Sequence, residues 1–204
     1  MHIIFLIDKS GSMSDKINPT IDGYNNFIEN QQKLETEDKC KVSLYLFSHN
    51  LETIYENREL DDTYKLNKKN YVPEGSTALF DSMGYILNNI NDKEKTIFVV
   101  ITDGQENSSN EYTESDIKEM IESRKDYLEM IYMGSNQDAI LAGNNMGSQV
   151  NINYDDIQTP NIYRGLSSAV TRVRQRKTPT IIFTQDEINT FTIQSETESQ
   201  SQPF

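Results

Sequence analysis

Cysteine, tryptophan and long apolar runs are scarce or missing in this 204-residue sequence. The single cysteine, Cys40, excludes an internal disulfide bond and favours a reducing compartment. The longest apolar runs, residues 3–7 and 97–101, are far shorter than the roughly 20 residues that cross a bilayer, so we expect no membrane span. The chain also opens without a basic and apolar leader. We therefore expect a cytoplasmic protein.

Basic residues are few as well. The sequence has 19 Lys and Arg residues against 32 Asp and Glu residues, which gives a net charge of -13. Such a charge is repelled by a phosphate backbone, so we expect no nucleic-acid partner. The hydrophobic content of 35% and the mean hydropathy of -0.67 are typical of a polar globular protein. A chain of this length buries enough surface to fold without a metal or a disulfide.

Short apolar runs, typical of strands buried on both faces, alternate with segments whose apolar residues recur at helical spacing. Strands are predicted over residues 2–7, 42–47, 51–55, 96–102, 128–133 and 149–152. Helices are predicted over residues 17–34, 78–90, 113–127, 137–145 and 161–176. This alternation predicts a doubly wound, Rossmann-like α/β fold, in which a mostly parallel sheet of about six strands has helices on both faces. Residues 51–55 would form one antiparallel edge strand.

The end of the chain has a different composition. Residues 180–184 and 190–193 are rich in β-forming residues and are compatible with a β-hairpin. Residues 195–202 consist of Ser, Glu, Thr and Gln alone, which predicts disorder. We therefore expect one domain over residues 1–177 and a C-terminal extension over residues 178–204.

Polar oxygen donors follow two of the predicted strands. Asp8, Ser10 and Ser12 come directly after the first strand, and Asp103 follows the strand at residues 96–102. Thr77 stands before the helix between them. In an open parallel sheet, ligands bind beyond the carboxyl ends of the strands, so we expect these groups to meet there. The two carboxylates would repel each other unless one is protonated or a cation separates them.

An oxygen-only donor set of this kind favours Mg²⁺, with Mn²⁺ or Ca²⁺ also possible. Gly11 is expected to let the first loop turn tightly, and Gly104 to keep a side chain from crowding the metal. Asp81, in the first turn of the following helix, either interacts with the helix dipole or supports the site from behind. Glu106, on the loop after Asp103, is either a solvated loop residue or a contact for a partner at the rim.

Each candidate ligand also has a structural alternative. Ser12 with Asp15 fits a capping box, and Ser76 or Thr77 would serve as the cap of the next helix. Asp103 and Gly104 form a common turn dipeptide. We favour the metal site because the donors come from three separate segments and converge on one expected crevice.

The donors occur in a recognisable order: Asp8-x-Ser10-x-Ser12, then Thr77, then Asp103-Gly104. This pattern resembles the metal-ion-dependent adhesion site (MIDAS) of the von Willebrand factor type A domain, and the resemblance covers residues 2–176. It implies a Rossmann-like fold and a Mg²⁺ ion bound by the three hydroxyls, with the two aspartates bonding directly or through water. It also implies an open coordination position that an Asp or Glu of a partner protein completes. Residues 133–139 are similar to those of stand-alone bacterial and phage members.

We therefore expect a module that binds an acidic residue of a partner protein through Mg²⁺. The adhesive role of secreted family members is not expected here, because the sequence has no leader and no cysteine pair. Two alternatives remain, a metal-dependent hydrolase or phosphatase-like enzyme and a domain whose metal is purely structural. The sequence offers little for an enzyme, since it has no phosphate-binding Gly-x-x-x-x-Gly-Lys loop and no Gly-x-Ser-x-Gly elbow. Ser10 also stands where an Asp-x-Asp phosphatase carries its second aspartate.

Overall fold

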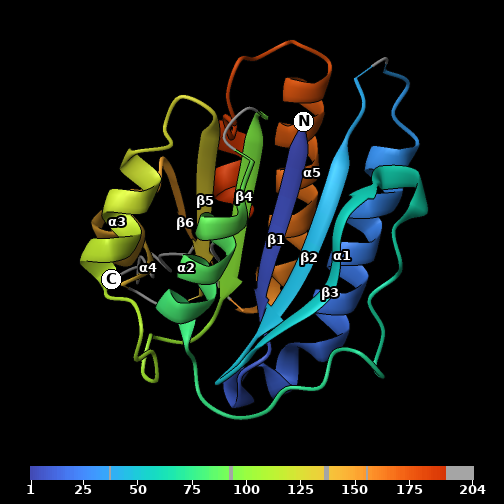
Figure 1. Ribbon diagram of the computed structural model, residues 1–204. Coiled ribbons are helices and arrows are strands. Elements are labelled where there is room, and N and C mark those ends of the chain that lie inside the picture. Colours follow the sequence, from blue (N-terminus) through green and yellow to red (C-terminus); the bar gives the residue numbers. More distant parts are fainter. Residues whose placement is uncertain (37, 92–93, 136–137, 155, 192–204) are drawn as a thin grey trace, which may run out of the picture.

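A six-stranded sheet forms the centre of the computed structural model, which describes residues 1–36, 38–91, 94–135, 138–154 and 156–191 (Figure 1). The strands are β1 (His2–Asp8), β2 (Lys41–Phe47), β3 (Leu51–Glu59), β4 (Thr96–Thr102), β5 (Leu128–Gly134) and β6 (Val150–Asn153). They lie in the order β3-β2-β1-β4-β5-β6, and each neighbouring pair is parallel except β2 and β3. The predicted fold class is confirmed, including the antiparallel edge strand, which is longer than expected.

Helices cover both faces of this sheet (Figure 1). The α-helices are α1 (Ile17–Gln32), α2 (Leu79–Asn89), α3 (Glu114–Glu122), α4 (Ala139–Asn145), α5 (Thr159–Arg174) and α6 (Gln185–Asn189). Short 3-10 turns are η1 (Gly11–Lys16), η2 (Leu60–Asp62) and η3 (Asp156–Gln158). Helices α1 and α5 pack on one face, and α2, α3 and α4 pack on the other. In the described ranges, no helix combines the length and the apolar character needed to cross a membrane.

The central strands β1 and β4 are neighbours, so the connections that follow them begin side by side. Every residue of both strands is buried, as expected for strands covered on two faces. The chain leaves β1 toward α1 on one face and leaves β4 toward α3 on the other. Connections that diverge in this way open a crevice at the carboxyl ends of the two strands. The register pairs Ile7 with Ile101, so Asp8 and Thr102 end the two strands at the same level.

The C-terminal extension packs on the domain in a different form from the predicted hairpin. Residues 180–184 have no strand structure, and α6 follows them. A capping box between Thr184 and Glu187 opens this helix in the segment between the two β-like pieces, where a hairpin would need its turn. Phe191 is fully buried against Gly165 of α5. The predicted disordered stretch and the end of the second β-like piece lie outside the described residues.

We predict that Phe191→Ala lowers the free energy of unfolding by about 3 kcal/mol, because it leaves a cavity against α5. Ile182→Ala is the matched control, since the Ile182 side chain is 51% exposed on the same segment. It should change the free energy by less than about 0.5 kcal/mol. Urea denaturation of the three proteins measures both values. Equal stability of the Phe191 variant and the wild type would show that the extension does not contribute to the domain.

His2 is a buried titratable group at the amino end of β1. Its Nε2 atom lies 2.9 Å from the Ser43 hydroxyl, which also accepts the N–H of Asn57 at 2.8 Å. Burial lowers the pKa of His2 to about 4, and the opposing charge of Glu94 only partly offsets this effect. The folded protein therefore keeps this imidazole neutral at pH values where an unfolded chain protonates it.

We predict that the wild type loses stability relative to His2→Gln as the pH falls from 6.5 to 4. In this interval the His2 imidazole is protonated in the unfolded chain but stays neutral in the folded protein, so protonation favours unfolding. From the pKa difference we expect a loss of roughly 3 kcal/mol, complete near pH 4 and absent above pH 7. Urea denaturation of both proteins across this range measures the difference. Parallel pH profiles would contradict the prediction.

Candidate metal centre

The loop after β1 and the loop after β4 meet at the crevice. The Ser12 hydroxyl donates to Asp103 Oδ1 at 2.5 Å, and Ser10 Oγ lies 3.1 Å from Ser12 Oγ. The backbone N–H of Ser10 donates to Asp8 Oδ1 at 2.6 Å. These contacts bring four of the five predicted ligands into one cluster, as their positions at the strand ends require.

Thr77, the fifth candidate ligand, approaches the other donors at Gly104. A Cβ atom added to Gly104 would lie 3.0 Å from Thr77 Oγ1, 3.5 Å from Asp8 Oδ2 and 3.7 Å from Ser12 Oγ. Oxygen atoms from the loop after β1 and from Thr77 therefore meet at Gly104, which lies on the loop after β4. The absence of a side chain at Gly104 leaves room at this point, which is the role the sequence predicts for this residue.

Asp8 is held in a buried position by donors on both carboxylate oxygens. Besides the Ser10 N–H at Oδ1, the Thr102 hydroxyl donates to Oδ2 at 2.6 Å and itself accepts the N–H of Gly104. Burial raises the pKa of Asp8, the hydrogen bonds from Thr102 and Ser10 oppose this effect, and the charge of Asp103 adds to it. A carboxylate that is costly to ionise in this way gains strongly from a nearby cation.

Lys16 is a member of the cluster that the sequence did not reveal. Its ammonium forms an ion pair with Asp103 Oδ2, and the two side chains are only 10% and 3% exposed. Lysine is rarely buried to this extent without a charged partner. The residue ends the η1 turn, and the path of this turn carries Lys16 back to the cluster. No spacing rule in the sequence predicts that path.

Hydrogen bonds join the loop after β4, which carries Asp103, to the segment that carries Thr77. The Asn107 N–H donates to the Thr77 carbonyl at 3.0 Å, and the Thr77 N–H donates to Asn107 Oδ1 at 2.9 Å. Glu106 accepts the N–H of Phe80, at the start of α2, at 3.0 Å. It also accepts the backbone N–H groups of Ser108 and Ser109. Glu106 thus holds the loop against α2, a role that neither alternative for this residue foresaw.

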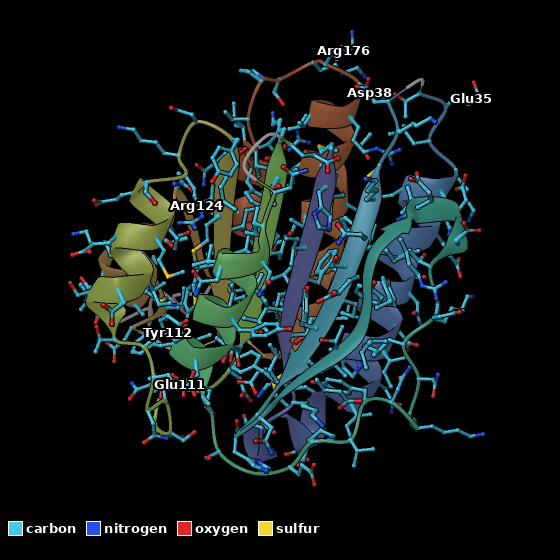
Figure 2. All side chains as sticks on the ribbon, viewed as in Figure 1. Glu35, Asp38, Glu111, Tyr112, Arg124 and Arg176 are labelled. Atoms are coloured by element: carbon cyan, nitrogen blue, oxygen red, sulfur yellow. The ribbon has the colours of Figure 1, made fainter. Side chains whose placement is uncertain are left out.

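Asp81 organises the next part of the same loop. Its carboxylate accepts the backbone N–H groups of Asn110, Glu111 and Tyr112 at 2.8 to 2.9 Å. Glu111 and Tyr112 lie at the end of the fold where β1 and β4 finish (Figure 2). Burial works against ionisation, but these three donors outweigh it and lower the pKa of Asp81. These contacts correspond to a supporting role on the loop that follows Asp103.

The capping alternatives for the candidate ligands are wrong. The Ser12 hydroxyl bonds to Asp103, and neither η1 nor α2 has a side-chain cap at its start. Ala78, one residue after Thr77, occupies the N-cap position of α2. The hydroxyls of Ser12 and Thr77 therefore face the cluster.

The expectation for Gly11 is also wrong. Among the described residues, only Gly75 and Gly147 are glycines with a positive φ. A Cβ atom added to Gly11 would lie 3.5 Å from the Gly75 carbonyl, which is an ordinary contact. Gly75 instead needs to be glycine, because its φ is 75° and the ring of His49 lies against it. The Gly11 N–H donates to the Gly75 carbonyl, so the two loops are joined at this point.

A pocket of about 290 Å³ opens beside Gly104, between α2, α3 and α4. Its apolar lining includes Leu79, Tyr132 and Leu141, and its polar lining includes Glu114. The Leu141 side chain is 61% exposed. A ligand bound at the cluster would therefore lie next to an apolar surface.

The donors fit a hard divalent cation. The candidate ligands supply two carboxylates and three hydroxyls, all of them oxygen donors, from Asp8, Ser10, Ser12, Thr77 and Asp103. Within the described ranges, no group of three or more His, Cys, Asp and Glu side chains is placed to hold a metal. A site for soft or nitrogen-preferring metals is therefore not found there, whereas oxygen donors suit Mg²⁺, Mn²⁺ or Ca²⁺.

A family model for the von Willebrand factor type A domain matches residues 2–156. No curated protein sequence matches the chain. Similar solved structures include a von Willebrand factor type A protein from Catenulispora acidiphila, with a TM-score of 0.60 and 13% identity over 83% of this chain and 42% of that one. The ArnB paralog VWA2 from Sulfolobus acidocaldarius has a TM-score of 0.57 and 23% identity over 83% and 44% of the two chains.

Proximal thread matrix protein 1 from the mussel byssus, in a structure with a zinc-occupied MIDAS motif, has a TM-score of 0.58 and 14% identity. The alignment covers 83% of this chain and 45% of the mussel protein. This chain thus spans less than half the length of these neighbours. At such low identity the likeness shows the shared fold alone.

We predict that Gly104→Ala weakens Mn²⁺ binding by about tenfold, because the added methyl group displaces Thr77 Oγ1 from the cluster. Gly11→Ala is the matched control, since its methyl group meets only an ordinary contact, and it should bind Mn²⁺ like the wild type. Calorimetric titration with MnCl₂ measures both affinities. Unchanged binding by the Gly104 variant would place the ion elsewhere.

Proposed function

The chain belongs to the von Willebrand factor type A domain family, and from this premise we propose that it is a divalent-metal-dependent protein-interaction module. We propose that Ser10, Ser12 and Thr77 hold Mg²⁺ with their hydroxyls, and that Asp8 and Asp103 bond to it directly or through water. The partner protein supplies an Asp or Glu carboxylate. The convergence of the loop after β1 and of Thr77 on Gly104, in the loop after β4, is the observation that carries this proposal. The zinc-occupied MIDAS of the mussel protein supports the same metal position in this fold.

The neutrality of the hydroxyl donors explains how the site would attract an acidic partner. When bound, the cation supplies a positive centre that accepts a further oxygen ligand. Hydroxyls contribute no negative charge, so they hold the ion without cancelling its attraction for a carboxylate. The Asn107 contacts fix Thr77, and Thr102 fixes Asp8, so the donors are oriented before a partner arrives. Because the protein has a net charge of -13, an acidic partner depends on this local attraction.

A binding role is better supported than an enzymatic one. The side chains that meet in the cluster are hydroxyls, two carboxylates and one lysine. His2 bonds to Ser43 at the amino end of β1, and the ring of His49 packs on Gly75. We therefore propose no catalytic residue. Burial raises the pKa of the Cys40 thiol to about 11, so this cysteine is protonated at neutral pH and is not suited to act as a nucleophile.

We predict that the Mn²⁺-loaded protein binds N-acetylglutamate methylamide, whose one carboxylate stands for the side chain of a partner. The carboxylate should replace a water on the ion and reduce the enhancement of water proton relaxation. The corresponding glutamine compound is the control and should have no effect. Asp8→Asn should weaken Mn²⁺ binding by at least about tenfold and remove the response.

Two outcomes would contradict the proposal. Mn²⁺ binding without a response to the carboxylate would favour a purely structural metal. Turnover of generic phosphatase or esterase substrates that disappears in Asp8→Asn would favour an enzyme. Affinity purification in Mg²⁺ and in EDTA, with wild type and Asp8→Asn, then identifies proteins whose capture depends on the ion.

A further inference from the structure

We propose that Lys16 tunes the metal centre, so that its ammonium weakens the binding of the cation and strengthens the binding of a carboxylate to the bound cation. The proposal rests on the proposed function, since it concerns the same site. It begins from the ion pair between Lys16 Nζ and Asp103 Oδ2, which lies inside the donor cluster. Ser12 Oγ donates to the other oxygen of Asp103, at 2.5 Å. Both carboxylate oxygens of this candidate ligand are therefore engaged by donors of the protein.

The position of Lys16 is built into the fold. Met13, in the middle of η1, is fully buried and anchors the turn, and its N–H donates to the Ser10 carbonyl at 3.0 Å. The turn ends at Lys16, and only 8% of the surface of this whole residue is exposed. An ion pair out of water loses much of its hydration, so its net contribution to stability is small. Its location beside the candidate ligands gives it a second effect, on any charge that binds there.

The first consequence concerns the cation. A fixed positive charge a few ångströms from the metal position repels a divalent ion, and partial burial makes this repulsion stronger than at the surface. The ammonium also competes with the ion for Asp103. Removal of the Lys16 charge should therefore make metal binding tighter.

The second consequence concerns the partner. Two ionised aspartates offset the charge of a divalent cation, so a centre made of these groups and the neutral hydroxyls has no net positive charge, although its open position still accepts a carboxylate. Lys16 leaves the loaded centre with a net positive charge. An acidic side chain then approaches a positive site on a protein whose total charge is negative. Removal of the Lys16 charge should make carboxylate binding weaker.

These two shifts have opposite directions, and this separates the proposal from a structural role for Lys16. If the lysine only supported the η1 turn, its loss would weaken metal binding and carboxylate binding together. Lys9 offers a matched control. It lies on the same loop with a similar exposure of 12%, but its ammonium pairs with Glu52 and Glu74 instead of Asp103.

The test compares wild type, Lys16→Met, Lys16→Arg and Lys9→Met. Methionine keeps the apolar stem of lysine and removes its charge, and arginine retains the charge. Calorimetry with MnCl₂ measures the metal affinity. Water proton relaxation of the Mn²⁺-loaded proteins measures the affinity for N-acetylglutamate methylamide. Thermal unfolding in EDTA checks that each variant is folded.

For Lys16→Met we expect metal binding about tenfold tighter and carboxylate binding of the loaded protein about tenfold weaker. Lys16→Arg and Lys9→Met should remain close to wild type in both measurements. Equal or weaker metal binding by Lys16→Met overturns the proposal, as does unchanged carboxylate binding. If Lys16→Met is unfolded in EDTA, tight metal and weak carboxylate binding by Lys16→Arg would likewise overturn it.

The same experiment distinguishes this inference from the proposed function. If the wild type binds Mn²⁺ but does not respond to the carboxylate, this result contradicts the proposed function. It also contradicts the proposed effect of Lys16 on carboxylate binding. A normal carboxylate response in the wild type, together with Lys16→Met values equal to those of the wild type, contradicts the Lys16 proposal alone. Wild-type protein that binds no Mn²⁺ overturns both.

Discussion

The approach of Asp8 and Asp103 at the ends of two central strands is the constraint on which the rest of the site depends. Parallel pairing of β1 with β4 forces these carboxylates into one crevice, where like charges repel. Donors from the protein itself reduce this repulsion. The Thr102 hydroxyl bonds to Asp8, and the Lys16 ammonium pairs with Asp103. The fold thus holds two acids together, and Gly104 leaves room beside them because it carries no side chain.

The loops around this crevice are joined by polar side chains that bond to backbone groups across them. Asn107 joins the loop after β4 to Thr77, and Glu106 and Asp81 bond to the N–H groups that follow. Backbone donors satisfied in this way fix the positions of neighbouring residues as well as their own. The proposed ligands are therefore presented by a scaffold whose supporting residues are as specific as the ligands themselves.

The sequence predicted the sheet and the clustering of the candidate ligands, because both depend on local patterns: buried strands read as continuous apolar runs, and the donors follow strand ends. It missed Lys16 and Asn107, since their contacts depend on the path of a 3-10 turn and of a loop. The hairpin failed for another reason. β-forming residues suggested strands at residues 180–184, whereas the capping box at Thr184 sets a helix immediately afterwards. This helix occupies the segment that a hairpin would need for its turn.

The antiparallel edge strand has a consequence for the sheet as a whole. An edge strand exposes backbone donors and acceptors on which a second chain can add another strand. Along β3 the sequence places Glu52, Glu56 and Glu59, and most of its residues are at least partly exposed. Two copies that met along β3 would bring together two strands that each carry these three glutamates and a single arginine, Arg58. Electrostatic repulsion between these strands therefore opposes aggregation along β3. The net negative charge of the whole chain acts in the same direction, because it keeps copies of the protein apart in solution.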